Sequence, residues 1–143
     1  MIAKLIKAFT GHEGSIYALE GSGRKDRVFT AGGDRIVSEW DLSGNEPARG
    51  VVKVEAVVYA LCHIPERNWL LVGTSEGRMH VIDLEGRKEL HNLELHKAGI
   101  FDLRFHPTTG NIFSASGDGS IAVLQLDRLD RTERRSLAPG HKI

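Results

Sequence analysis

The sequence predicts an all-β fold assembled from three repeats of one small antiparallel sheet. The first observation is a period of 42 residues, which carries Trp40 onto Ile82 and then onto Leu124 without a gap. The second is that each copy divides into short apolar runs separated by turns containing Gly, Asp, Asn or Pro, a pattern typical of strands. The third is that no segment carries the apolar stripe of an amphipathic helix.

Each copy contains three apolar runs and a more polar fourth one. In the first copy they are SIYAL, VFTAG, IVSEW and RGVVKV, separated by GSGRKD, GDR and a longer turn. The later copies repeat this order with HIPERN or HPTTGN as the first turn and SEG or GDG as the second. Glycine and Asp favour such tight reversals. Each repeat is therefore expected to be a four-stranded antiparallel sheet whose least apolar strand lies outermost.

The expected organisation is a single domain. It comprises a first strand at residues 2–9, repeats at residues 10–52, 53–94 and 95–138, and the start of a fourth repeat at residues 139–143.

Composition and charge indicate a soluble globular protein. The 143 residues are 41% hydrophobic and 27% charged, and 19 basic residues balance 19 acidic ones. A net charge of zero gives no general attraction to nucleic acid or to an anionic membrane. The single cysteine, Cys62, excludes an internal disulfide, and the amino end is too short for a membrane span. We therefore expect a cytoplasmic protein that binds neither nucleic acid nor membrane.

Gly11-His12 before the first strand and Trp40-Asp41 at the end of the third form a GH…WD pattern. Across nearly its whole length, the sequence resembles the WD-repeat family of β-propellers. The resemblance implies a hydrogen-bonded set of side chains that locks each blade: His12, Thr30, Asp34 and Trp40 in the first copy, and His96, Ser114 and Asp118 in the third, where Leu124 replaces the Trp. The second copy has Val54, Val72, Glu76 and Ile82 at these positions, so apolar packing is expected to hold it.

The ring implied by this resemblance is incomplete, because propellers typically close with four to eight blades. In the family, a strand such as residues 2–9 joins the last blade and closes the ring, and Gly140-His141 repeats the Gly11-His12 pair. We therefore expect either a part-propeller that completes its ring by self-association, most simply a six-blade dimer, or a fragment of a larger propeller.

No catalytic, metal or cofactor site is predicted. The pairs His91/His96 and Cys62/His63 lack the spacing of known metal motifs. The loop GSGRKD precedes no helix that could hold a phosphate, so a surface turn is the simpler interpretation. The arginine-rich residues 127–135 are read as a solvated loop and not as a nucleic-acid patch. Nothing therefore points to an enzyme.

An aromatic residue recurs near the start of each first strand. The resemblance implies that this position and the turn after the second strand face one end of the ring, where partners bind. The candidate partner contacts are Ser15, Tyr17, Arg35, Val57, Tyr59 and Phe101. The alternative is that the aromatic side chains only pack around the central channel.

The expected function is a non-enzymatic scaffold for protein–protein interaction. One alternative is an assembly fragment of a larger propeller with no partner of its own. Another is a ligand-binding or enzymatic propeller that uses its central channel.

Overall fold

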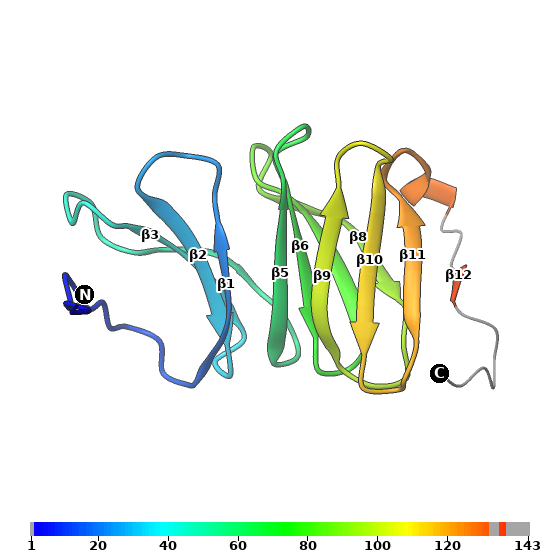
Figure 1. The fold of residues 1–143 in the computed structure, drawn as a ribbon, viewed down its shortest axis with the longest axis horizontal. Coiled ribbons are helices and arrows are strands. Elements are labelled where there is room, and N and C mark those ends of the chain that lie inside the picture. The colour runs from blue at the N-terminus through cyan, green and yellow to red at the C-terminus, as the bar shows by residue number, and fades with distance from the viewer. Residues whose placement is uncertain (1, 132–134, 137–143) are drawn as a thin grey trace.

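Three four-stranded antiparallel sheets lie side by side in the computed structural model, which describes residues 2–131 and 135–136 (Figure 1). In each sheet the strands are hydrogen-bonded in chain order. We call the sheets β1–β4, β5–β8 and β9–β12 blade 1, blade 2 and blade 3. The all-β fold and its three repeats, predicted from the sequence, are confirmed.

The strand bounds follow the repeat. In blade 1 they are β1 (Ile16–Gly21), β2 (Arg27–Gly32), β3 (Ile36–Asp41) and β4 (Arg49–Lys53). In blade 2 they are β5 (Val58–Ile64), β6 (Trp69–Thr74), β7 (Arg78–Asp83) and β8 (Lys88–Glu94). In blade 3 they are β9 (Ile100–His106), β10 (Asn111–Ser116), β11 (Ile121–Gln125) and β12 (Arg135–Ser136). A short 3₁₀ helix, Leu126–Arg131, occupies part of the segment expected to be a loop.

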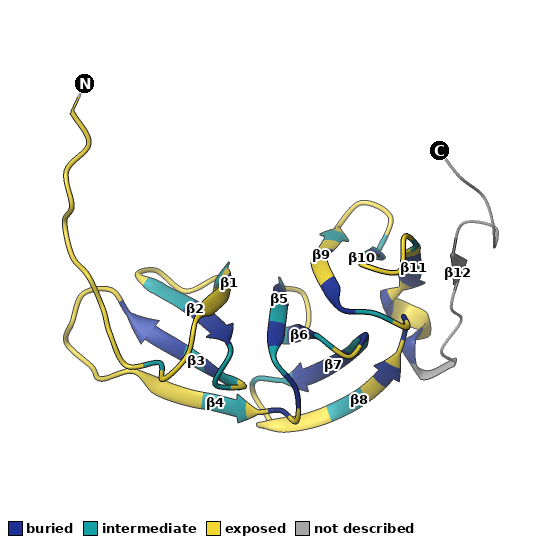
Figure 2. Cartoon of the chain, turned by 90° about the horizontal axis from the view of Figure 1, so that it is seen from below, coloured by how far each residue is buried: buried dark blue, intermediate teal, exposed yellow. Residues whose placement is uncertain are grey.

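The three blades form an arc (Figure 2). Strands β1, β5 and β9 lie along one side of the arc, and the outer strands β4 and β8 lie along the other. Most residues of β4 and β8 are exposed or half-buried. The more polar fourth runs of the first two copies are thus the outermost strands, as suits strands with one edge facing solvent.

The hydrophobic core lies between neighbouring blades. One cluster of buried side chains joins blade 1 to blade 2, and a second joins blade 2 to blade 3. Leu70, Leu71 and Val72 are consecutive in β6 and all fully buried. Successive side chains of a strand point to opposite faces. Leu70 and Val72 therefore pack toward blade 1 while Leu71 packs toward blade 3.

Among the described residues, no other blade covers the outward face of blade 1. Ile16 is 50% exposed and Leu19 is 70% exposed. Their counterparts one and two repeats later are all buried: Val58, Leu61, Ile100 and Leu103. The difference arises because blades 2 and 3 each pack this face against the preceding blade, whereas the described residues include no blade on this side of blade 1.

Residues 2–9 form no strand in this structure, contrary to the expectation from the sequence. Lys7 Nζ instead donates to the carbonyl oxygens of Leu42 and Ser43, both at 3.2 Å, and the Phe9 ring lies 5.9 Å from that of Trp40. A strand needs a sheet edge to satisfy its backbone. The edge that the resemblance assigns belongs to the last blade of a closed ring, and three blades do not close one.

The expected start of a fourth repeat at residues 139–143, with Gly140-His141, lies outside the described residues. Among the residues that are described, no helix has the length and apolar character needed to cross a membrane.

Candidate functional site

The structure brings His12, Thr30, Asp34 and Trp40 together at one end of blade 1. His12 Nδ1 lies 2.7 Å from Asp34 Oδ2, and His12 Nε2 lies 2.6 Å from Thr30 Oγ1. The Trp40 indole N–H donates to the same hydroxyl oxygen at 2.6 Å. The indole can only donate, so the Thr30 hydroxyl accepts from Trp40; the Asp34 carboxylate can only accept, so in the neutral tautomer of His12 that donates to it, Nε2 accepts the Thr30 hydroxyl proton. The remaining imidazole proton then sits on Nδ1 and points to Asp34.

Asp34 anchors this set in the turn between β2 and β3. Its carboxylate accepts the backbone N–H of Ile36 at 3.1 Å and that of Glu13 at 3.2 Å, besides the His12 ring. Burial favours the neutral acid. The hydrogen bonds from Ile36, His12 and Glu13 nevertheless outweigh burial and hold the pKa of Asp34 below its usual range.

Blade 3 carries a shorter version of the same arrangement. His96 Nε2 lies 2.7 Å from Ser114 Oγ, and Nδ1 lies 3.1 Å from Asp118 Oδ2. Ser120, which the sequence analysis did not single out, adds a contact at 2.9 Å to His96 Nδ1. Burial opposes ionisation of Asp118, but hydrogen bonds from Ser120 and Lys97 overcome it and lower the pKa of that carboxyl strongly. Leu124 fills the place of the indole and is buried.

Blade 2 replaces this set with buried apolar side chains, Val54, Val72 and Ile82. It also contains a buried histidine that the period did not reveal. His80 is only 2% exposed; its Nε2 lies 3.4 Å from Glu55, and its Nδ1 is hydrogen-bonded to Glu89. The other two copies have Ser38 and Ala122 at this position, so the repeat gave no signal for it.

Three aromatic rings line the inner side of the arc, one from each blade. The Tyr17 and Tyr59 ring centroids are 5.3 Å apart at 80°, and those of Tyr59 and Phe101 are 5.4 Å apart at 37°. Tyr17 is 56% exposed and Phe101 is 60% exposed, whereas Tyr59 between them is half-buried. We call Tyr17, Tyr59 and Phe101 the aromatic row. A hollow in the surface is lined by these three side chains.

Glycines next to the row hold two of its rings in place. A Cβ atom on Gly99 would lie 3.0 Å from Tyr59 Cε2, and one on Gly117 would lie 3.0 Å from Phe101 Cε2. The rings therefore rest directly against backbone that carries no side chain. A side chain at Gly99 or Gly117 would therefore crowd the ring beside it.

Arg35 lies in the turn after β2, at the same end of blade 1 as Tyr17, since Ile16 pairs with Gly32. Its N–H donates to the Gly32 carbonyl at 3.2 Å, closing a tight turn. Its φ is 67°, and the equivalent residues, Gly77 and Gly119, have φ of 79° and 84°. A non-glycine residue in this left-handed region costs about 1–2 kcal/mol. Blade 1 thus places an exposed arginine where the other blades have glycine.

The two remaining candidates contribute mainly backbone. The carbonyl of Ser15 accepts from Gly33 N–H at 2.8 Å, and that of Val57 accepts from Ser75 N–H at 2.8 Å. The Ser15 side chain is exposed and that of Val57 is half-buried. In the part of the chain that the structure describes, no three His, Cys, Asp or Glu side chains are grouped so as to hold a metal ion. Burial, the largest effect, raises the pKa of Cys62 to about 12, which disfavours the reactive thiolate.

Comparison with known proteins identifies the family of this chain. The family model described as "WD domain, G-beta repeat" matches residues 3–41 and 87–123, more than half of the chain. The chain belongs to the WD-repeat family. Its sequence is 25% identical over 117 residues to transducin-like enhancer protein 2 of Mus musculus, covering 82% of this chain. It is 28% identical over 92 residues to small ribosomal subunit protein RACK1 of Brassica napus, covering 64% of this chain.

The same fold is found in a solved WD-repeat structure. The crystal structure of the RRP9 WD40 repeats superposes with a TM-score of 0.75 over 90% of this chain at 17% sequence identity. This chain covers 40% of that structure, 15% of the mouse protein and 28% of the RACK1 protein. The three WD-repeat blades thus correspond to a part of each longer relative.

Proposed function

We propose that this chain is part of a non-enzymatic protein-interaction scaffold, which docks a protein partner at the end that carries the aromatic row and Arg35. We further propose that blades outside this chain complete its ring, in the simplest case the three blades of a second copy. The observation that carries the docking proposal is the exposed aromatic row, positioned by glycine backbone.

Exposed aromatic and arginine side chains are the residue types that most often supply binding energy in protein interfaces. Tyr17 and Phe101 each keep more than half of their surface accessible. Their neighbour Tyr59 fixes the spacing of the row through ring contacts on both sides. A preorganised apolar surface of this kind reduces the entropy that a partner must lose on binding.

Arg35 supports the same site. Glycine would relieve the backbone at this turn, as it does in blades 2 and 3. Residues that retain a strained backbone conformation cluster at binding sites, because selection for contact can outweigh the local cost. The Arg35 side chain is exposed and lies at the end of blade 1 that carries Tyr17. There it can reach an acidic or carbonyl group of a partner.

Ring completion is supported by the outward face of blade 1. Ile16 and Leu19 occupy positions that are buried against a preceding blade in both other repeats. In the amino-terminal segment, Ile2, Leu5 and Ile6 are each at least 79% exposed. Large apolar side chains that are left exposed in this number support an interaction surface. A further blade would cover it.

The relatives agree with a scaffold role. One is named as a protein of the small ribosomal subunit, which is a large assembly. A protein that docks within an assembly needs a surface complementary to its partner and does not need a catalytic group.

Docking is tested by quantitative affinity purification with the full chain as bait. Arg35→Glu and Tyr17→Ala should each deplete the same partner at least tenfold, with unchanged circular dichroism. Lys88→Glu on outer strand β8 is the matched charge control and should retain the partner. Equal recovery with all three variants would refute docking at this end.

Ring completion is tested separately by light scattering across a concentration series. Self-association predicts masses above the 15.8 kDa of one chain at micromolar concentration and a return to that mass in Leu19→Glu. Leu42→Glu places the same charge at the turn after β3 and should not change the mass. A mass of one chain at every concentration would exclude the dimer while leaving the docking proposal intact.

A further inference from the structure

A second hollow lies between blades 1 and 2, at the end opposite the aromatic row. It encloses about 150 Å³. Its polar lining comes from turns that meet at this end: Ser22 and Arg24 after β1, Asn68 after β5, and Asp83 and Arg87 around the turn after β7, together with Glu39 and Arg49 of blade 1. Because Gly21 pairs with Val28 while Ile16 pairs with Gly32, the β1–β2 turn is at the far end of blade 1 from Tyr17.

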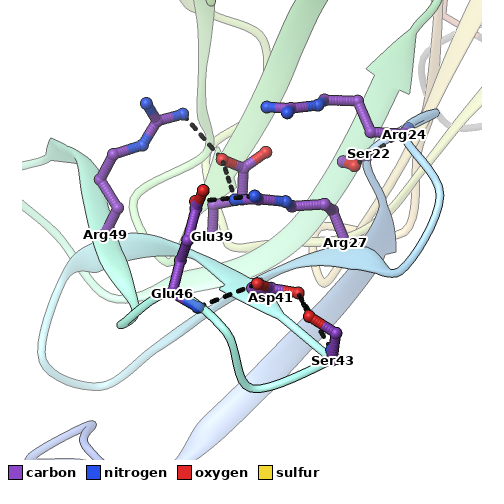
Figure 3. Close-up of polar contacts among 8 residues, drawn as sticks. All are labelled: Ser22, Arg24, Arg27, Glu39, Asp41, Ser43, Glu46 and Arg49. Atoms are coloured by element: carbon purple, nitrogen blue, oxygen red, sulfur yellow. Dashed lines mark hydrogen bonds and ion pairs between the residues drawn. The ribbon is translucent and has the colours of Figure 1, made fainter.

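Two carboxylates near the hollow are already neutralised by arginine. Arg49 Nη2 lies 2.7 Å from Glu39 Oε1, and Arg27 approaches the same oxygen at 3.9 Å (Figure 3). Arg27 also forms a 2.7 Å ion pair with Glu46. The Glu39 side chain is only 4% exposed, so these guanidinium groups compensate a buried charge.

Two other arginines have no such partner. Among the described residues, no hydrogen bond or ion pair engages the guanidinium group of Arg24 or that of Arg87. Both side chains line the hollow, and in Figure 3 the Arg24 and Arg49 guanidinium groups lie to the right and to the left of the Glu39 carboxylate. The hollow is lined by three arginines and two carboxylates, which leaves an excess of positive charge. They are Arg24, Arg49 and Arg87, and Glu39 and Asp83.

Neutral donors add to this set. The Ser22 hydroxyl is buried and accepts the Arg24 backbone N–H at 3.2 Å. Within the described part of the chain no acceptor takes its own hydrogen, so it can donate into the hollow. Asn68 Oδ1 is paired with His63 Nε2 at 3.1 Å, which leaves the Asn68 amide hydrogens available.

We propose that this hollow, hereafter the guanidinium pocket, binds a phosphate group. Donors from Ser22, Arg24, Arg49, Asn68 and Arg87 approach it from two blades. A carboxylate presents two oxygens, whereas a phosphate group presents three or four and matches the fork of several guanidinium groups. The hollow of about 150 Å³ is large enough to admit a tetrahedral anion.

The phosphate can be a free ion or can be carried on a phosphorylated side chain. A third, more open hollow of about 530 Å³ adjoins the guanidinium pocket and shares Arg24, Arg49 and Gly50 with it. Gly50 has open space where a Cβ would lie. This hollow leaves room for the peptide on either side of a phosphoserine.

The test is titration of the ¹⁵N-labelled full chain with inorganic phosphate, followed through the arginine Nε–H resonances. A second arm uses the peptide Gly-Ala-pSer-Ala-Gly and its unphosphorylated form. Shifts should concentrate on Arg24, Arg49 and Arg87. The double variant Arg24→Gln/Arg87→Gln should weaken binding at least tenfold, because both unengaged charges are lost. Arg78→Gln, on a half-exposed arginine at the opposite end of blade 2, should change the dissociation constant less than twofold.

The substitution Glu39→Gln should have the opposite effect on the affinity for phosphate. It removes a negative charge from the pocket at constant volume and frees Arg49, so phosphate should bind more tightly. A purely structural role of these arginines predicts no such gain. Tighter binding of the phosphopeptide than of inorganic phosphate would identify a phosphorylated protein as the source, and equal or weaker binding would identify the free ion. The proposal is overturned if the double variant binds phosphate as the Arg78→Gln control does.

The guanidinium pocket is independent of the docking proposal. Tyr17→Ala should leave phosphate binding unchanged, since the aromatic row lies at the other end of the blades.

Discussion

Substitution of Thr30 by valine is the sharpest test of the hydrogen-bonded set in blade 1. Valine has nearly the same shape but no hydroxyl, so the change strands two groups at once. The indole N–H of Trp40 and Nε2 of His12 each lose a 2.6 Å contact. A buried polar group left unsatisfied costs about 1–3 kcal/mol, which predicts a loss of about 2–6 kcal/mol in the free energy of unfolding.

Blade 2 supplies the control for this prediction. Its Val72 occupies the position of Thr30, with Val54 and Ile82 in place of His12 and Trp40. In His12→Val/Trp40→Ile the polar partners are already absent, so adding Thr30→Val should cost far less than it does alone. A double-mutant cycle measured by urea unfolding separates the two cases.

The reasoning is refuted if Thr30→Val alone costs less than about 1 kcal/mol, or if it costs the same with and without its polar partners. Either result would mean that the three side chains do not depend on the hydroxyl, whatever their distances.

Three further predictions follow from local environments. The pKa values of Asp34 and Asp118 are lower in the folded than in the unfolded state, so their contribution is fully present above the unfolded value near 3.9. It should fade as the pH falls through the folded values, and acid titration monitored by circular dichroism should show stability that is flat above about pH 5 and falls below about pH 4. Gly32→Ala should destabilise by at least about 1–3 kcal/mol, because its Cβ would come within 1.9 Å of a backbone oxygen, whereas Gly21→Ala meets nothing within 4 Å and should not. Native Cys62 should resist iodoacetamide at pH 8 and react after unfolding in urea; equal rates would contradict its burial.

The repeat made most of the fold predictable from the sequence. A 42-residue period constrains each position three times, so Trp40, Ile82 and Leu124 could be assigned to one structural position although only Trp40 carries a hydrogen-bond donor in its side chain. The same register placed Tyr17, Tyr59 and Phe101 at equivalent strand positions. Their spacing of 5.3 and 5.4 Å follows from the packing of adjacent blades and could not be read from the sequence.

Features that depart from the repeat could not be predicted. The other copies have Ser38 and Ala122 at the position of His80. Its burial beside Glu55 and Glu89 is therefore specific to blade 2. The guanidinium pocket combines Arg24 of blade 1 with Arg87 of blade 2, and neither copy alone shows it. Such a site forms only where turns of two different blades meet in space. The repeat pattern of the sequence does not predict which turns meet.

The distribution of the polar sets follows from the geometry of the arc. Blade 2 is covered on both faces, so apolar burial alone can hold Val54, Val72 and Ile82. Blades 1 and 3 each have one neighbour within the chain and therefore lose part of that burial. These are the two blades that carry the His12 and His96 sets, whose directional bonds do not depend on a covered face. Among the described residues, the hydrogen-bonded sets thus lie in the two blades that have one neighbouring blade, and apolar packing on both faces holds the central blade.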